Sequence, residues 1–270
     1  MARRRILPRR VRRLAWPLTA CVLAAMTSGR AFAGTTVDFG FEDGRRLLET
    51  QREGGRVYVP DDVSSSESTP LVVFLHGTNR EGRLHRWMRP GPRDLRPVVD
   101  ALIAREAIVP VLLAAPSQTR DADSGRSLWS NFDLARFLDR TQGALGDRAR
   151  VAPEQVIVLG HSGAGCNTAG GLLRIAAERS EITPAAIVAI DTCMSADTAR
   201  FLAQADERTT RQVYWQPFTW PRDFQDFLDQ VAPRRTDVFR EIHETGPSPH
   251  YDVVRPAFVA ALETLLPSGS

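Results

Sequence analysis

The stretch VIVLGHSGAG, residues 156–165, decides the fold of this 270-residue chain. Four apolar, mostly β-branched residues precede a serine, Ser162, that stands among small residues. Such a run is typical of a strand covered on both faces. Glycines at 160 and 163 permit a sharp turn that exposes a serine hydroxyl above the sheet. The alternative interpretation is a glycine-rich turn with a solvent-facing serine.

Strand and helix patterns alternate from residue 70 onward. Strands are expected at 70–77, 108–116, 155–160, 185–190, 211–218 and 236–244, and helices at 94–107, 130–145, 166–180, 221–231 and 255–266. Ser130 or Asn131 is the expected cap of the second helix, and the third would point its N-terminal N–H groups at Ser162. Residues 45–60 predict two antiparallel strands around Gly54-Gly55. This order predicts a mostly parallel sheet with helices on both faces, and reactive groups beyond the carboxyl ends of its strands.

A second motif, LVVFLHGTN (71–79), is a buried strand that ends at His76-Gly77; by itself it is also an ordinary strand exit with a polar cap. Taken with the turn at Ser162, it makes the chain resemble the α/β-hydrolase family, and most closely its secreted esterase and depolymerase-like branch. The resemblance covers roughly residues 56–265. It implies the α/β-hydrolase fold, Ser162 as nucleophile, and an oxyanion hole made by the N–H groups of Gly163 and Thr78. Ala164 stands where the motif usually has its last glycine, which is a mild departure.

A serine hydroxyl needs a base to become a nucleophile, and the chain has five histidines. His250 lies in TGPSPHYD (245–252), a loop between the last expected strand and the last expected helix, where the resembling family keeps its base. His76 and His161 are motif neighbours with packing or hydrogen-bonding parts. His85 lies in an arginine-rich loop, and His243 within an expected strand. We therefore predict His250 as the base.

Two aspartates compete for the third position. Asp191 ends the apolar strand AAIVAID (185–191), where a buried carboxylate requires a partner. Asp223, in FTWPRDF, follows the next strand, which is the commoner family location, but it also suits a helix N-terminus. We favour Asp191 and keep Asp223 as the alternative. Either acid would orient the imidazole and stabilise the imidazolium.

The N-terminus has the three regions of a secretory signal: a basic segment (1–13), an apolar segment (14–26), and AFA (31–33) before Gly34. We expect residues 1–33 to be removed and residues 34–270 to form a single catalytic domain in the periplasm or outside the cell, with no stable membrane insertion. The arginine pairs in the basic segment are compatible with twin-arginine export as well as with the Sec route. Lipoprotein anchoring at Cys21 is the less favoured outcome.

The chain has no lysine, so all 35 basic residues are arginine, and eight of them lie in residues 1–33. The mature chain then has 27 arginines against 32 acidic residues, and its mildly acidic balance speaks against nucleic-acid binding. Two cysteines remain, Cys166 and Cys193. In an oxidising compartment they would form a disulfide if the strands before Ser162 and Asp191 are neighbours.

Other signals are weak. No pair of cysteines or histidines has zinc spacing, and no glycine-rich phosphate loop appears, so we expect neither a metal nor a cofactor. Aromatic residues near 84–92, 127–132 and 214–221 either line a pocket or pack in the core. A group of arginines would attract an acidic substrate or, as we favour, form a solvated cluster: Arg83, Arg86, Arg89, Arg93 and Arg96.

The sequence thus predicts an exported serine hydrolase that cleaves a small or polymeric carboxylic ester through an acyl-enzyme on Ser162. A peptidase or amidase with the same residues is one alternative. A non-catalytic binding protein on a hydrolase scaffold is another.

Overall fold

Runs of valine, leucine, isoleucine and alanine form the strands of one sheet, because these side chains suit a pleated surface buried on both faces. The computed structural model describes residues 34–41, 54–118, 128–178, 181–217, 219 and 224–269. All of them fall within one compact unit. The strands in these ranges are β1 (Thr35–Phe39), β2 (Gly55–Val59), β3 (Ser68–Leu75), β4 (Leu112–Pro116), β5 (Arg150–His161), β6 (Ala186–Ile190), β7 (Thr210–Trp215) and β8 (Val238–Glu241).

The strand order is β1-β2-β4-β3-β5-β6-β7-β8. β1 pairs antiparallel with β2, and β2 pairs antiparallel with β4. Every other neighbouring pair in this sheet is parallel. The prediction of a mostly parallel sheet is therefore confirmed, and β3, β5 and β6 lie side by side.

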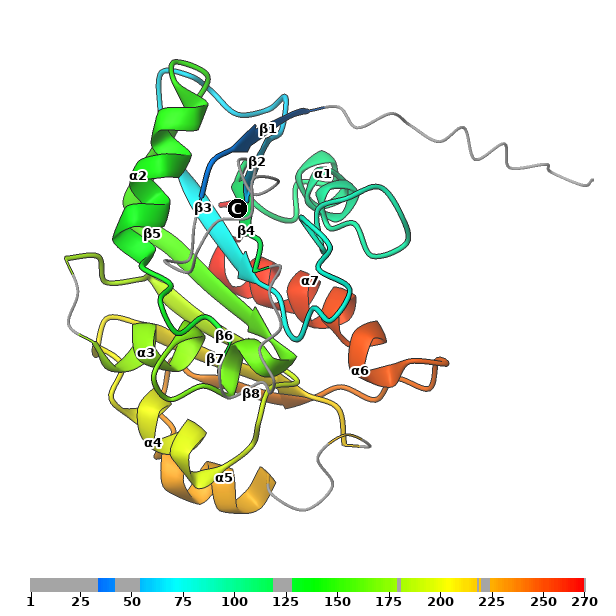
Figure 1. The fold of residues 1–270 in the computed structure, drawn as a ribbon, viewed down its shortest axis with the longest axis vertical. Coiled ribbons are helices and arrows are strands. Elements are labelled where there is room, and N and C mark those ends of the chain that lie inside the picture. Colours follow the sequence, from blue (N-terminus) through cyan, green and yellow to red (C-terminus); the bar gives the residue numbers. More distant parts are fainter. Residues whose placement is uncertain are drawn as a thin grey trace, which may run out of the picture. The chain divides into compact units, whose positions relative to one another are not determined.

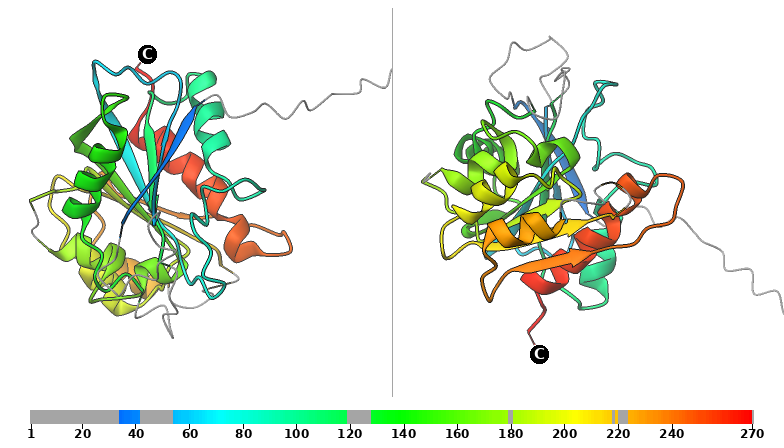
Figure 2. Two further views of the ribbon diagram at one scale, coloured as in Figure 1. Left: turned by 45° about the horizontal axis from the view of Figure 1, so that its top comes forward. Right: turned by 90° about the horizontal axis from the view of Figure 1, so that it is seen from below.

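Helices cover both faces of the sheet (Figures 1 and 2). The described helices are α1 (Arg96–Ala104), α2 (Leu134–Leu145), α3 (Gly171–Ala177), α4 (Ala196–Ala203), α5 (Phe224–Val231), α6 (Pro249–Asp252) and α7 (Val254–Leu265). Residues of α2, α3, α4 and α5 pack in one apolar core with one face of the sheet. Residues of α1 and α7 pack in a second core on the opposite face. The expected arrangement of two helical layers is confirmed.

The N-terminal strand pair differs from the prediction. β2 pairs with Thr35–Phe39, which lies before the expected partner; that partner falls in residues 42–53, outside the described ranges. Gly55 is not part of a turn but lies in β2, opposite Phe39. A Cβ atom on Gly55 would lie 2.3 Å from the Phe39 ring. The glycine is needed for ring packing rather than for chain reversal.

Two helix starts also differ. α2 is capped by Asp133, whose side chain accepts a hydrogen bond from the Arg136 N–H, and not by Ser130 or Asn131. The helix expected over 166–180 is α3, which begins only at Gly171, and a one-turn 3₁₀ helix, Ser162–Gly165, follows β5 instead. Gly171 has φ +56°, and a Cβ atom there would lie 2.6 Å from the Ala164 carbonyl oxygen. This glycine lets the chain turn before it re-enters a helix.

Candidate active site

Ser162 stands at the carboxyl end of β5, on a tight turn. Its φ is 56°, a left-handed conformation that costs a non-glycine residue about 1–3 kcal/mol and is common at functional sites. Gly77, after β3, packs directly against it: a Cβ atom on Gly77 would lie 2.5 Å from the Ser162 Cβ and 3.0 Å from its Oγ. The small residues of the two motifs therefore bring the β3 loop and the serine together. Ala164 is buried and fits without positive φ, so its methyl group does not disturb the turn.

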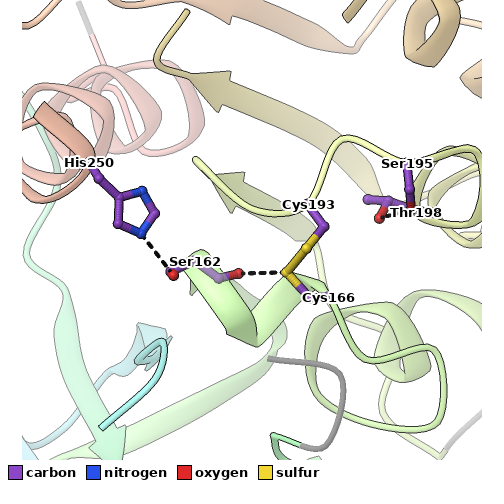
Figure 3. The surroundings of a disulfide bond; sticks show 6 residues. All are labelled: Ser162, Cys166, Cys193, Ser195, Thr198 and His250. Carbon is purple, nitrogen blue, oxygen red and sulfur yellow. Dashed lines mark hydrogen bonds between the residues drawn. A yellow bond between two sulfur atoms is a disulfide. The ribbon is translucent and has the colours of Figure 1, made fainter. Parts of the chain in front are cut away.

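His250 meets Ser162 across 88 residues of sequence. It lies on α6, the single helical turn that precedes α7. Its Nε2 is 2.8 Å from the Ser162 Oγ, and Figure 3 shows the ring pointing at the serine. The His250 side chain is 28% exposed, so solvent reaches the pair.

Asp191 is the acid that the structure brings to His250. It follows β6 directly and is fully buried. One carboxylate oxygen contacts the Nδ1 of His250, and the other accepts a hydrogen bond of 2.9 Å from the Gln216 N–H. Because a carboxylate only accepts hydrogen bonds, Nδ1 carries the proton and Nε2 is left to accept the serine hydroxyl. The alternative acid, Asp223, lies outside the described residues.

His161 supports the main chain of His250. Its Nε2 donates a 2.8 Å hydrogen bond to the His250 carbonyl oxygen. Its ring lies 4.7 Å from the His250 ring and packs edge-on against Trp87. Burial lowers the pKa of His161 well below its usual 6.5, so the ring is neutral at pH 7. The sequence predicts a hydrogen-bonding or packing role for His161. Its hydrogen bond goes to the backbone of His250, the residue predicted as the base.

His76 holds the loop after β3. Its Nε2 accepts a 2.9 Å hydrogen bond from the Gln118 N–H, and its Nδ1 lies 2.7 Å from the Gly77 carbonyl oxygen, to which it donates. Burial lowers the pKa of His76 to about 4. Trp129 donates from its indole nitrogen to the His76 carbonyl oxygen, at 2.9 Å. These bonds fix the segment that carries Thr78, one of the two residues expected in the oxyanion hole.

Gly163 and Thr78 lie on the two segments that meet at the serine. Gly163 is buried within the 3₁₀ turn that begins at Ser162. Thr78 is half-buried and directly follows Gly77. The structure thus places the segments of the two expected N–H donors on either side of the Gly77–Ser162 contact.

Cys166 and Cys193 form a disulfide, with 5.1 Å between their Cα atoms. The Cys166 sulfur also lies 3.5 Å from the Ser162 carbonyl oxygen (Figure 3). Cys193 is two residues beyond Asp191. The bridge therefore links the turn of the serine to the loop of the acid.

The remaining sequence signals lie elsewhere. His85 is buried beside Asp38, and His243 is exposed beside Glu241, beyond the end of β8.

No cluster of three potential metal ligands occurs in the described part of the chain. Four of the described aromatic residues that we singled out are buried packing groups: Trp129, Phe132, Tyr214 and Trp215. Trp87 is also buried, but it lines a cavity beside Tyr251. Sequence reasoning missed Gln216, which contacts Asp191 through a backbone N–H that no residue pattern reveals.

The sheet order and the strand–turn at Ser162 define the class: the chain has the α/β-hydrolase fold. A ferulic acid esterase is similar over 87% of this chain and 98% of its own, with a TM-score of 0.58 and 14% identity. A mutant of the feruloyl esterase module from Clostridium thermocellum, complexed with sinapinate, is similar over 86% of this chain and 88% of its own, with a TM-score of 0.61 and 11% identity.

The enterobactin esterase from Shigella flexneri also shares the fold, with a TM-score of 0.58 and 16% identity; the match covers 86% of this chain and 58% of that one. Comparisons with known protein families and with curated proteins find no match for this chain. No helix in the described ranges has the length and hydrophobicity that a membrane span requires.

Proposed function

We propose that this protein is a serine hydrolase that cleaves carboxylic esters. The observation that carries the proposal is the line of contacts from Asp191 through His250 to Ser162, at the carboxyl edge of the sheet. Esterases among the structures of the same fold support the choice of an ester as the scissile bond.

In the proposed reaction, Ser162 Oγ attacks the ester carbonyl while His250 Nε2 takes its proton. The N–H groups of Gly163 and Thr78 would stabilise the oxyanion. His250 then gives its proton to the departing alkoxide, which leaves as an alcohol. A water molecule, deprotonated by the same nitrogen, resolves the acyl-enzyme. Throughout, Asp191 keeps Nδ1 protonated and stabilises the imidazolium.

We also propose that the protein is exported, with residues 1–33 as its signal. The disulfide supports this, because such bonds persist in oxidising compartments. The signal itself lies outside the described residues. N-terminal sequencing of protein recovered from the periplasm or medium should begin at Gly34; a chain that stays in the cytoplasm and starts at Met1 contradicts the export proposal.

The function is tested with p-nitrophenyl esters of increasing acyl length beside a set of peptide p-nitroanilides. We expect turnover of esters well above that of amides, and loss of ester turnover in Ser162→Ala. The matched control is Ser64→Ala, since Ser64 is an exposed loop serine. Circular dichroism and thermal melting establish that both variants fold. Equal ester turnover in all three proteins contradicts the proposal, and faster amide cleavage favours the amidase alternative.

A further inference from the structure

Two arginines lie on the ring of the residue that follows His250. The Arg86 guanidinium carbon is 5.2 Å from the centre of the Tyr251 ring, and that of Arg93 is 4.2 Å from it. The Tyr251 ring is in turn 5.3 Å from the His250 ring. Arg86 also donates a hydrogen bond to the Thr78 carbonyl oxygen. It therefore joins the β3 loop to α6, at the edge of the candidate active site.

Arg86 differs from three better-buried arginines in what faces it. Three arginines with side chains 16% exposed or less each form an ion pair with an aspartate: Arg56 with Asp38, Arg96 with Asp94, and Arg211 with Asp237. Arg86 is half-buried, it contacts the Thr78 carbonyl oxygen and the Tyr251 ring, and no carboxylate of the described residues forms an ion pair with it within 4 Å. Arg93 is exposed and has no such partner in these ranges either. Because the half-buried Arg86 is less well hydrated than a surface charge and has no counter-charge among the described residues, the pair is suited to an anion from outside the chain.

Neither of the two neighbouring aspartates forms an ion pair with Arg86 or Arg93. A cavity of about 140 Å³ lies beside Tyr251, with Arg93, Arg255, Asp94 and Asp252 in its wall. Asp94 is held by Arg96, and Asp252 accepts a 3.1 Å hydrogen bond from the Ser248 N–H. Asp94 is thus already paired with an arginine, and neither aspartate lies within 4 Å of the Arg86 or Arg93 guanidinium. Arg86 and Arg93 keep N–H donors for a carboxylate.

The position of the pair indicates which part of an ester it would meet. His250 must protonate the departing alkoxide, so the alcohol portion of the substrate has to lie beside the His250 ring. The Tyr251 ring contacts the His250 ring, and the guanidinium groups of both arginines lie over the Tyr251 ring. Arginine recognises carboxylates through paired N–H donors, and stacking on an aromatic ring fixes the plane of the guanidinium.

We propose that Arg86 and Arg93, oriented by Tyr251, bind a carboxylate on the alcohol portion of the ester substrate. The inference rests on the proposed function and adds a substrate class to it: esters whose leaving group is anionic. It also revises our expectation of a solvated cluster for Arg86, which is half-buried and bonded to the Thr78 carbonyl oxygen. Arg96 is buried beside Asp94, whereas Arg83, Arg89 and Arg93 are exposed as expected.

The test compares 4-acetoxybenzoate with its neutral analogue 4-acetoxybenzamide, each rate divided by that of alkaline hydrolysis of the same ester. We expect kcat/KM for the carboxylate to exceed that for the amide by about tenfold, mainly through KM, since bonds to charged groups are the stronger ones. In the Arg86→Gln/Arg93→Gln double variant the preference should disappear. Arg150→Gln is the control, because Arg150 is an exposed arginine that begins β5, at the opposite end of that strand from Ser162.

A wild-type enzyme that does not favour the carboxylate overturns the proposal, as does a preference that survives in the double variant. Titration calorimetry of the Ser162→Ala protein with 4-hydroxybenzoate and 4-hydroxybenzamide keeps the two proposals distinguishable, because it needs no catalysis. Tighter binding of the benzoate, lost in the Ser162→Ala protein that also carries both Gln substitutions, supports the anion site even if neither ester is cleaved. Equal binding of the two phenols contradicts it.

Discussion

The loop after β3 and the helical turn α6 after β8 both bring a histidine to the same edge of the sheet, but the two rings are bonded differently. Both ring nitrogens of His76 bond to backbone groups, those of Gln118 and Gly77. Both ring nitrogens of His250 contact side chains, those of Asp191 and Ser162. A ring held by the main chain stabilises a loop, whereas a ring between an acid and a hydroxyl is free to transfer a proton. The bonding partners, more than the position, separate the histidine that holds a loop from the histidine that we propose as the base.

The largest effect on kcat is expected from a substitution that breaks the contact between His250 and Asp191. Asp191→Asn should lower kcat on the order of 10⁴-fold, because an amide allows the wrong imidazole tautomer. Asp223→Asn, at the alternative acid, should leave kcat almost unchanged. Steady-state kinetics on one p-nitrophenyl ester decides between them; a large loss in the Asp223 variant alone would reverse our assignment.

The disulfide links the segments of the two groups that His250 contacts. Replacing Cys166 and Cys193 together by serine should reduce the free energy of unfolding by about 3 kcal/mol, as expected for a loop closed across 27 residues. Urea unfolding of the mature protein measures this. A double variant as stable as the native protein would show that the bridge contributes nothing to the folded state.

His161 sharpens the comparison, since it bonds to the backbone of His250, the proposed base. His161→Phe keeps an aromatic ring but removes the N–H donor to the His250 carbonyl oxygen. Because His250 then loses its fixed position, kcat should fall about tenfold with little change in KM. His161→Gln keeps a donor and should recover part of the loss. His243→Gln, at an exposed position, is the control. Equal losses in both His161 variants, or a change in KM alone, would contradict a positioning role.

The last effect is graded with pH and concerns the two buried rings. Burial lowers the pKa of His76 to about 4 and that of His161 well below 6.5, so both stay neutral in the folded protein while the unfolded chain takes up protons below pH 6.5. The contribution of these two rings to the free energy of unfolding should therefore be constant above pH 7. It should fall from pH 6.5 toward 4, by up to about 1.4 kcal/mol per pH unit for each ring. Urea unfolding between pH 7 and 5 should show a shallower fall in His76→Gln; parallel curves would contradict it.

Much of this arrangement follows from patterns in the sequence. Alternating apolar runs indicate the parallel sheet because β3, β5 and β6 are buried on both faces and read as continuous hydrophobic segments. A partner for Asp191 is predictable because a carboxylate that ends such a strand has to be paired, and the structure pairs it with His250. The choice of His250 as the proposed base follows from its place after the last strand.

The rest depends on contacts between distant residues. Gly55 lies in a strand because the Phe39 ring occupies the space where a side chain would be. α3 begins late because Gly171 turns the chain away from Ala164. The bonds of His161 and Gln216 to the site join positions far apart in sequence, one through a carbonyl oxygen and one through a backbone N–H. No local pattern reports such contacts.

The central claim is that Ser162 is a nucleophile activated by His250. Its most direct test is a fluorophosphonate probe, whose phosphorus bonds to an activated serine oxygen as fluoride leaves, followed by peptide mass spectrometry of the mature protein. The account predicts one stoichiometric adduct on Ser162, absent in Ser162→Ala and formed far more slowly in His250→Ala. An unlabelled native protein, or an adduct at another residue that persists in both variants, would contradict it.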